Sequence, residues 1–146
     1  MNSTPYLATY QHDVTVTWGE SDPFGLVYYP HILAWFNDAE HEFFRHIGYP
    51  IDEMVRADGT TFVMGDVKFR FLGPSLYGDP VSCTMNLRKI GQRTLHWDCI
   101  ATNARTTDTI TEGTAVRVYA RLDDQNMLTS VDIPDTLRRA ITERDV

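Results

Sequence analysis

The chain has 146 residues, and 13 Lys and Arg against 20 Asp and Glu give it a net charge of −7. This length is typical of one domain, and the acidic balance argues against nucleic acid or an anionic membrane as partner. The chain lacks a basic start followed by an apolar run, and no apolar run approaches the ~18 residues of a membrane span, so we expect neither a signal peptide nor a span.

The first elements in chain order are a strand and a long helix. The stretch "YQHDVTVTW", residues 10–18, alternates and is rich in β-branched residues, which predicts a strand. After a turn-rich segment, "PHILAWFNDAEHEFFRHIG", residues 30–48, carries an apolar stripe at helical spacing, with Pro30 in its first turn and Gly48 at its end. The stripe consists of Ile32, Phe36, Ala39, Phe43 and Ile47, widened by Leu33, Trp35 and Phe44. A helix this apolar must be largely enclosed by other elements.

The rest of the chain is mostly β-structure. Residues 51–59 predict a short helix ended by Gly59, and the apolar period then changes to two. We expect strands over 61–71, 80–90, 93–104 and 108–122, with a hairpin at Gly91 and Gln92, and a short helix over 131–141. In the first of these strands Val63, Gly65 and Val67 are expected on the inward face, where Gly65 would let the helix approach closely.

The order of elements predicts the fold class. One strand, one long helix and about four further strands are segregated rather than alternating, which is typical of α+β proteins. An antiparallel sheet of five strands wrapped around the long central helix is the natural way to bury that helix. We expect a single domain over residues 1–146.

Several common functional devices are missing from the sequence. There is no G-x-G-x-x-G, no G-x-x-x-x-G-K-[ST] and no G-x-S-x-G motif. His41 and His46 are five residues apart, so on a helix they diverge by roughly 140° and do not form a metal pair. Cys83 and Cys99 have no metal or secreted-type spacing. We therefore expect no metal, and a cytoplasmic protein with reduced thiols.

The turn before the long helix holds one acidic residue, Asp22. Pro23 keeps Asp22 out of helical geometry, and Gly25 permits a tight backbone turn. The helix start at Tyr28 to His31 presents backbone N–H groups without partners in a preceding turn, and these can stabilise an anion or polarise a carbonyl. A carboxylate beside such a helix end can cleave an activated acyl bond, but a plain surface turn accounts for the same residues.

The segment "DPFGLVYYPHILAWF", residues 22–36, resembles the active-site signature D-P-x-G-[IV]-V-x-Y-[PH] of the 4-hydroxybenzoyl-CoA thioesterase family of hotdog-fold proteins. The stretches "FVMGDVKFRFLGPSLYGDPV" and "RKIGQRTLHWDC" are similar to the family's second strand and central hairpin. The resemblance implies a hotdog fold, with Asp22 as the catalytic carboxylate and the Tyr29 backbone N–H on the thioester oxygen. It also implies a homodimer that pairs again into a tetramer, with active sites at the subunit interface.

The same resemblance implies where the two parts of an acyl-CoA would lie. The expected substrate-binding residues are Pro23, Gly25, Trp35, Asn37, Asp38, Phe62, Val63, Met64 and Gly65. Coenzyme A would follow the outside of the sheet, although generic solvated charge explains its candidate cations equally well. These candidates are Lys68, Arg70, Arg88, Lys89 and Arg93. No cofactor is implied beyond the coenzyme A of the substrate.

We therefore expect a thioesterase that hydrolyses an aromatic or short-chain acyl-CoA to the free acid and CoA. Asp22 would act either as nucleophile or as general base. One alternative is hydrolysis of acyl groups carried by acyl carrier protein, against which the acidic surface argues because carrier proteins are acidic. A second alternative is a hotdog module that binds acyl-CoA without catalysis.

Overall fold

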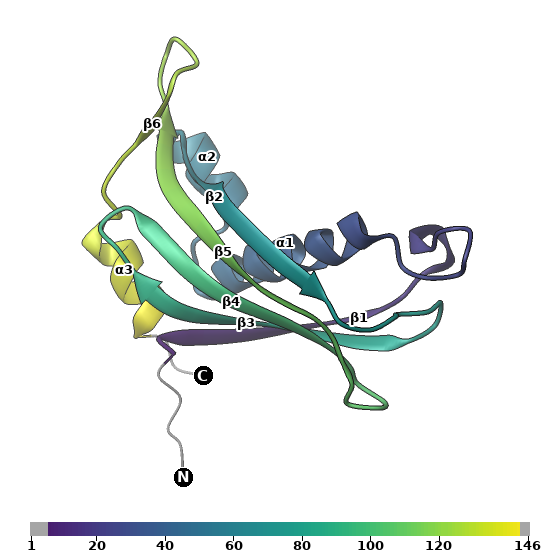
Figure 1. The fold of residues 1–146 in the computed structure, drawn as a ribbon. Coiled ribbons are helices and arrows are strands. Elements are labelled where there is room, and N and C mark those ends of the chain that lie inside the picture. Colours follow the sequence, from purple (N-terminus) through teal and green to yellow (C-terminus); the bar gives the residue numbers. More distant parts are fainter. Residues whose placement is uncertain (1–5, 144–146) are drawn as a thin grey trace.

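A computed structural model describes residues 6–143 (Figure 1). The elements in chain order are β1 (Ala8–Thr15), the 3-10 helix η1 (Trp18–Glu20), α1 (Tyr29–His46), α2 (Ile51–Asp58), β2 (Thr60–Phe71), β3 (Pro80–Ile90), β4 (Thr94–Asn103), β5 (Thr109–Leu122), β6 (Leu128–Ser130) and α3 (Asp135–Thr142). The elements expected from the sequence are all present, and the α+β class is confirmed.

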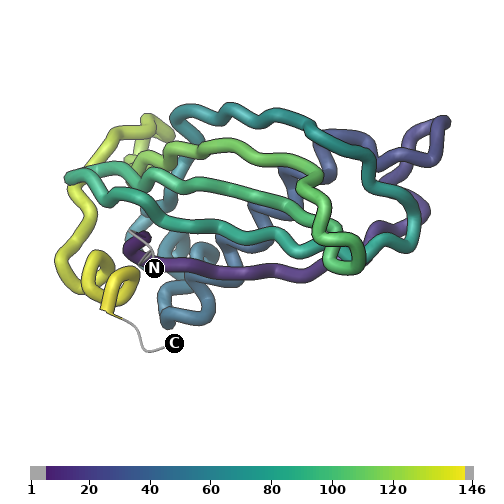
Figure 2. Tube along the Cα trace, turned by 60° about the horizontal axis from the view of Figure 1, so that its bottom comes forward, coloured from purple at the N-terminus to yellow at the C-terminus, as the bar shows by residue number. Residues whose placement is uncertain are grey.

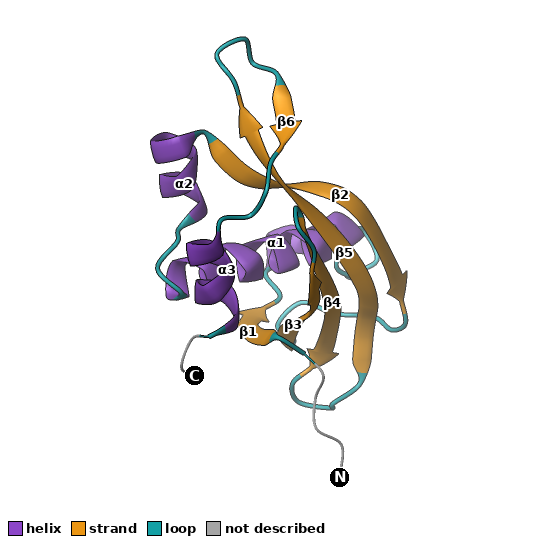
Figure 3. Ribbon diagram, turned by 90° about the vertical axis from the view of Figure 1, so that its left-hand side faces the viewer, coloured by secondary structure: helices purple, strands orange, loops and turns teal. Residues whose placement is uncertain are grey.

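The strands form one antiparallel sheet in the order β1-β3-β4-β5-β2, and Figure 2 shows these five strands side by side. The short β6 pairs with the end of β5, so the sheet has one strand more than expected. Helix α1 lies across the concave face of the sheet (Figures 1 and 3). This is the expected sheet curved around a central helix.

The inward side chains of the sheet and of α1 form one core. In β4, and in β3 as far as Leu87, every second residue is buried, as the alternation predicts. Trp97 packs edge-on against Phe43 of α1 with ring centroids 5.5 Å apart. Of the expected α1 stripe, Ile32, Phe36, Ala39 and Phe43 are buried, whereas Ile47 is half-buried at the end of the helix.

The predicted inward face of β2 is wrong over its first half, because the strand contains a β-bulge between Met64 and Asp66. Before the bulge the inward residues are Phe62 and Met64, not Val63 and Gly65; after it the prediction holds again at Val67. A side chain at Gly65 would meet Val118 and Val116 of β5 at 3.0 and 3.3 Å, so the glycine allows close approach of a strand and not of the helix.

The loop between β1 and α1 is fastened to the helix by the Glu20 carboxylate. One oxygen of Glu20 accepts a hydrogen bond from the Thr17 N–H (2.9 Å), and the other accepts one from Trp35 Nε1 in α1 (2.8 Å). The Tyr28 N–H donates to the Glu20 carbonyl (2.9 Å) and closes the loop. Burial alone would raise the pKa of Glu20, but the hydrogen bonds from Thr17 and Trp35 outweigh it and lower the pKa.

The lowered pKa of Glu20 predicts a pH-dependent contribution to stability. The contribution of an acid whose folded pKa is lowered is present above its unfolded pKa and is lost as the pH falls through the folded pKa. We expect Glu20→Gln to cost about 1 kcal/mol at pH 7, because the amide replaces one of the two acceptor oxygens. Urea unfolding should show this difference shrinking below about pH 4.5; a difference of constant size down to pH 3 would contradict the assignment.

Candidate active site

Asp22 lies in a closed loop at the start of α1. Its Oδ1 accepts hydrogen bonds from the N–H groups of Phe24 (2.8 Å) and Leu26 (3.2 Å). The Asp22 N–H donates to the Leu26 carbonyl (2.6 Å), and Gly25 adopts φ +81°, which permits the turn. The side chain is half-buried, and Oδ2 has no hydrogen-bond partner among residues 6–143. The carboxylate is therefore held by its own loop, with one oxygen left available.

The loop ends where α1 begins. Tyr28 is the N-cap residue, and no side chain caps the helix start. The His31 N–H donates to the Tyr28 carbonyl, Pro30 has no N–H, and the Tyr29 N–H has no partner within the described chain. An unpaired N–H at a helix N-terminus can donate to the oxygen of a bound carbonyl, where it also benefits from the helix dipole.

The helix start also lies beside the end of β2. The Tyr29 ring packs against Phe71, the last residue of β2, with centroids 5.8 Å apart. The Val27 N–H donates to the Ser75 carbonyl (2.9 Å), and Leu26 forms a β-bridge with Leu76. The loop of Asp22, the first turn of α1 and the exposed end of β2 thus meet in one region.

A cavity of about 380 Å³ runs along α1 from this region, between the helix and strands β2 and β5. We call it the helix cavity. It is lined by Pro30, Leu33, Ala34, Phe36, Asn37 and Glu40 of α1, Met64, Val67 and Phe69 of β2, Met85 and Cys99, and Ala115 and Arg117 of β5. Its walls are mostly apolar, and its size falls in the ~300–1,000 Å³ range of small-molecule sites.

Charged and amide groups gather at one part of the helix cavity. Arg117 Nε contacts Glu40 Oε1 at 2.7 Å, and Arg117 Nη2 donates to Asn37 Oδ1 at 2.9 Å. The other Glu40 oxygen accepts from Trp97 Nε1 at 2.9 Å in the core. Burial raises the pKa of Glu40, while Arg117 and the Trp97 N–H act in the opposite direction. We call Asn37, Glu40 and Arg117 the polar end of the cavity.

The expected substrate-binding residues divide between this cavity and other places. Asn37 and Met64 line the cavity, whereas Trp35 and Phe62 belong to the core: Trp35 donates to Glu20, and Phe62 stacks on Phe44. Asp38 is exposed and does not line the cavity. The remaining four lie in the Asp22 loop or beside the β2 bulge: Pro23, Gly25, Val63 and Gly65.

Three of the five expected CoA-binding cations line a second cavity, on the outer face of the sheet. Lys68, Arg70 and Arg88 border this outer cavity of about 430 Å³ together with Asp98 and Glu112. Arg88 forms an ion pair with Asp98, which also accepts a hydrogen bond from the Tyr6 hydroxyl (2.9 Å). Lys68 and Arg70 are exposed.

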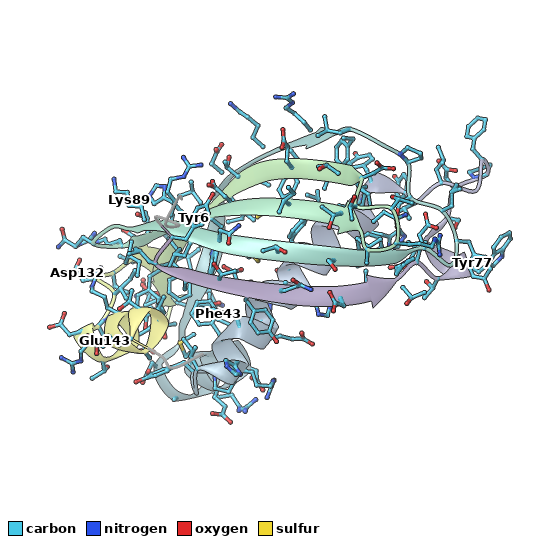
Figure 4. The ribbon with its side chains drawn as sticks, turned by 90° about the horizontal axis from the view of Figure 1, so that it is seen from below. Tyr6, Phe43, Tyr77, Lys89, Asp132 and Glu143 are labelled. Carbon is cyan, nitrogen blue, oxygen red and sulfur yellow. The ribbon has the colours of Figure 1, made fainter. Side chains whose placement is uncertain are left out.

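The other two cations lie away from the outer cavity. Arg93 pairs with Asp132 at 2.7 Å and donates to Ser130. Figure 4 shows Lys89 at the end of the sheet opposite Tyr77, and Tyr77 packs against Trp18 of η1, next to the Asp22 loop.

Two residues of the helix cavity, Glu40 and Arg117, were not predicted from the sequence. Both carried a signal, because each falls in phase with the core: Glu40 is four residues after Phe36, and Arg117 alternates inward between Ala115 and Tyr119. An ionisable residue in a buried phase indicates a paired or functional group. The pairing itself could not be read, because 77 positions separate the two residues (117 − 40).

Within residues 6–143 no group of three His, Cys, Asp or Glu side chains could hold a metal ion. In the same range no helix is long and apolar enough to cross a membrane. Cys83 and Cys99 are free and buried, and burial raises the pKa of the Cys83 thiol to about 12.

Residues 16–141 match the family model of the thioesterase-like superfamily. No curated protein sequence matches the chain. Among solved structures, the 1,4-dihydroxy-2-naphthoyl-CoA thioesterase of Synechocystis is similar with a TM-score of 0.83 at 14% identity, covering 92% of this chain and 96% of that one.

Two further thioesterase structures are similar over comparable lengths. Gentisyl-coenzyme A thioesterase has a TM-score of 0.78 at 23% identity, covering 90% of this chain and 98% of that one. The 4-hydroxybenzoyl CoA thioesterase of Pseudomonas sp. strain CBS-3 has a TM-score of 0.77 at 18% identity, covering 91% and 99%. The chain therefore belongs to the thioesterase-like superfamily, and it is a thioester hydrolase with the hotdog fold.

Proposed function

We propose that the protein hydrolyses an aromatic or short-chain acyl-CoA to the free acid and CoA, with Asp22 as the catalytic carboxylate. The observation that carries this proposal is the position of Asp22: its loop ends at the unpaired Tyr29 N–H, where the apolar helix cavity begins. An acyl group in the cavity would bring its thioester carbonyl to the first turn of α1. The Tyr29 N–H would then donate to the carbonyl oxygen as negative charge develops on it.

Two routes fit this arrangement. As nucleophile, Asp22 attacks the thioester carbonyl, the C–S bond breaks, and CoA leaves as its thiolate. Water then hydrolyses the mixed anhydride, which restores the carboxylate and releases the proton that the thiolate takes up. As general base, Asp22 removes a proton from the water that attacks the carbonyl, and that proton goes to the leaving thiolate. Both routes consume one water and use the free Oδ2 of Asp22.

The three structural neighbours support an aromatic acyl group. By name they act on 1,4-dihydroxy-2-naphthoyl-CoA, gentisyl-CoA and 4-hydroxybenzoyl-CoA. The aromatic and sulfur-containing walls of the helix cavity suit a ring, since Phe36, Phe69 and Met64 present broad apolar surfaces there.

Coenzyme A would lie on the outer face of the sheet, with its phosphates near Lys68 and Arg70. These two cations border the outer cavity and form no ion pair within the described chain, whereas Arg88 is already paired with Asp98. Two cations without carboxylate partners favour an anionic ligand at this face.

We further propose a homodimer that pairs through β2. This strand lies at the edge of the sheet and exposes Met64, Val67 and Phe71, the first two of which also line the helix cavity. Apolar residues on an unpaired edge strand favour pairing with another strand, and a second copy offers an identical one. The partner would then cover the side of the helix cavity that β2 borders.

The catalytic role predicts the effect of Asp22→Asn. The amide keeps the size of the side chain and can still accept from Phe24 and Leu26, but it neither attacks nor removes a proton. We expect kcat to fall at least ~100-fold with little change in acyl-CoA affinity, measured as thiol release and as calorimetric binding. Asp38→Asn, at an exposed carboxylate outside the cavity, is the control. Normal turnover by Asp22→Asn would refute the assignment.

The proposed position of coenzyme A predicts a binding defect. We expect Lys68→Gln and Arg70→Gln each to raise KM several-fold with kcat nearly unchanged, because phosphate contacts distant from the reacting bond bind substrate and transition state alike. The KM of the wild type should also rise with salt. Arg139→Gln, on α3 away from the outer cavity, is the matched control. Equal KM values in all four proteins would place CoA elsewhere.

The proposed dimer predicts a difference between two exposed apolar positions. We expect Val67→Asp, on the β2 edge, to shift the protein to monomers in sedimentation experiments, because pairing would bury two carboxylates. Leu128→Asp, on β6 and similarly exposed, should leave the oligomer intact. A wild type that sediments as a monomer of 16.7 kDa would disprove the dimer.

A further inference from the structure

The polar end of the helix cavity offers more hydrogen-bond donors than acceptors. Both oxygens of Glu40 are occupied, one by Arg117 and the other by Trp97. The Asn37 oxygen accepts from Arg117, which leaves the two N–H groups of its amide. A guanidinium carries five N–H groups, and only Nε and one Nη2 N–H of Arg117 have partners within residues 6–143.

The unused donors of Arg117 are largely removed from water, whereas Asn37 is exposed on α1. The side chain of Arg117 is 13% exposed and that of Glu40 is 4% exposed, and both residues line the cavity. A polar group in such a place costs free energy unless a partner satisfies it. An oxygen atom at the end of a bound acyl group would supply that partner.

The charge balance at the polar end restricts what kind of oxygen fits. Arg117 and Glu40 neutralise each other, since one cation faces one carboxylate at 2.7 Å. A ligand carboxylate would add a second negative charge beside the buried Glu40 with no second cation, because among residues 6–143 no other Lys or Arg lines the cavity. A hydroxyl, carbonyl or ether oxygen accepts the same hydrogen bonds without that penalty.

The spacing along α1 sets the length of the acyl group. Asn37 follows Tyr29 by eight residues, which is about 12 Å along the helix axis. A single aromatic acyl group with a hydrogen bond at each end has about this reach. Between the two ends the cavity wall is apolar, with Leu33 and Phe36 on the helix.

We propose that Arg117 and Asn37 form a specificity site that accepts a neutral oxygen at the far end of the acyl group. The proposal rests on the proposed function, because it takes the Tyr29 N–H as the position of the thioester carbonyl. Arg117 binds the ligand oxygen, and Glu40 positions the guanidinium and balances its charge. The site therefore selects acyl groups that carry a distal hydroxyl, carbonyl or ether over unsubstituted and carboxylated ones.

A purely structural role for the pair is the competing explanation. A buried ion pair is a weak source of stability, and apolar residues of similar volume often replace it without loss. A structural pair also needs no third group, yet Asn37 binds the guanidinium from an exposed position on α1. The fixed fork of Arg117, held on two sides, is the arrangement expected of a site that recognises an oxygen.

The first test compares thioesters that differ only at the distal position. Hydrolysis of 3-hydroxybenzoyl-, 4-hydroxybenzoyl-, benzoyl- and 4-carboxybenzoyl-CoA would be measured as kcat/KM. We expect the better hydroxylated substrate to exceed both benzoyl- and 4-carboxybenzoyl-CoA by at least ~10-fold. Rapid hydrolysis without a preference for hydroxyl, or with a preference for carboxylate, would overturn the inference and leave the proposed function intact.

The second test changes Arg117. Arg117→Lys keeps the charge beside Glu40 but loses the planar fork, and so it avoids leaving a buried carboxylate without a partner. We expect kcat/KM for the better hydroxylated substrate to fall at least ~10-fold and that for benzoyl-CoA to change less than ~3-fold. Arg56→Lys, at an exposed ion pair on α2, is the matched control. An equal loss for both substrates would indicate a structural role.

The third test does not depend on hydrolysis. Binding of the same four thioesters to Asp22→Asn would be measured by calorimetry, where the same order of affinities is expected. If the wild type cleaves no thioester, the proposed function fails, but these affinities still decide whether the polar end selects a neutral oxygen. Equal affinities, tightest binding of the carboxylate, or no binding at all would each refute the specificity site.

Discussion

The structure of the site depends on the hydrogen bonds that fix the loop between β1 and α1. The loop that carries the proposed catalytic carboxylate must be ordered without help from regular secondary structure, and here the Glu20 side chain supplies the link to Trp35 of α1. The Tyr28 N–H and the Glu20 carbonyl then close the loop, so that its last residue is also the N-cap of α1. Because loop closure and helix start coincide, the position of Asp22 and that of the Tyr29 N–H are set together. Such coupling keeps the carboxylate and the helix N–H, which we propose as attacking group and oxyanion donor, in one geometry.

The helix whose first N–H is the proposed oxyanion donor also provides one wall of the cavity and part of its polar end. Successive turns of α1 place Pro30, Leu33 and Asn37 along the same wall, while Phe43 and other apolar residues on an adjacent face pack into the core. In the proposed complex, the distance from the reacting carbonyl to the recognised oxygen is therefore set by the rise of one rigid helix. Strands β2 and β5 form the other wall of the cavity. In a regular strand, residues three positions apart, such as Met64 and Val67, would point to opposite faces of the sheet. The bulge at Gly65 shifts the alternation by one residue, so that both line the cavity.

The sequence predicted the fold well because each segment has a single hydrophobic period. The alternation in β3 and β4 indicates strands only, and the apolar stripe of α1 indicates a helix only. The inward face predicted for Val63 and Gly65 was wrong because of the β-bulge. One extra residue in a strand moves all side chains before it to the opposite face, and neither composition nor period marks the position of that residue. Asp22 stood out by its turn residues, and the structure places it in the loop expected for it. Arg117 and Glu40 could not be paired, because contacts between a helix and a distant strand are determined by the packing of the whole fold.

The buried pair of Glu40 and Arg117 gives a physical reason for the selectivity that we propose for the cavity. An entirely apolar cavity distinguishes acyl groups weakly, because an added or missing methylene is worth only about 1–3 kcal/mol, and such a cavity rejects an added hydroxyl poorly. A site with unsatisfied donors rejects ligands that lack an acceptor, since binding them would leave the donors buried and without partners. The donors here belong to a cation, Arg117, which by itself would attract any anionic ligand. The carboxylate of Glu40 balances that charge, so the donors remain but the net positive charge does not. The pair makes the end of the cavity polar without giving it a net charge. Recognition of a neutral oxygen would account for an ion pair in the core, since such a pair is a weak source of stability.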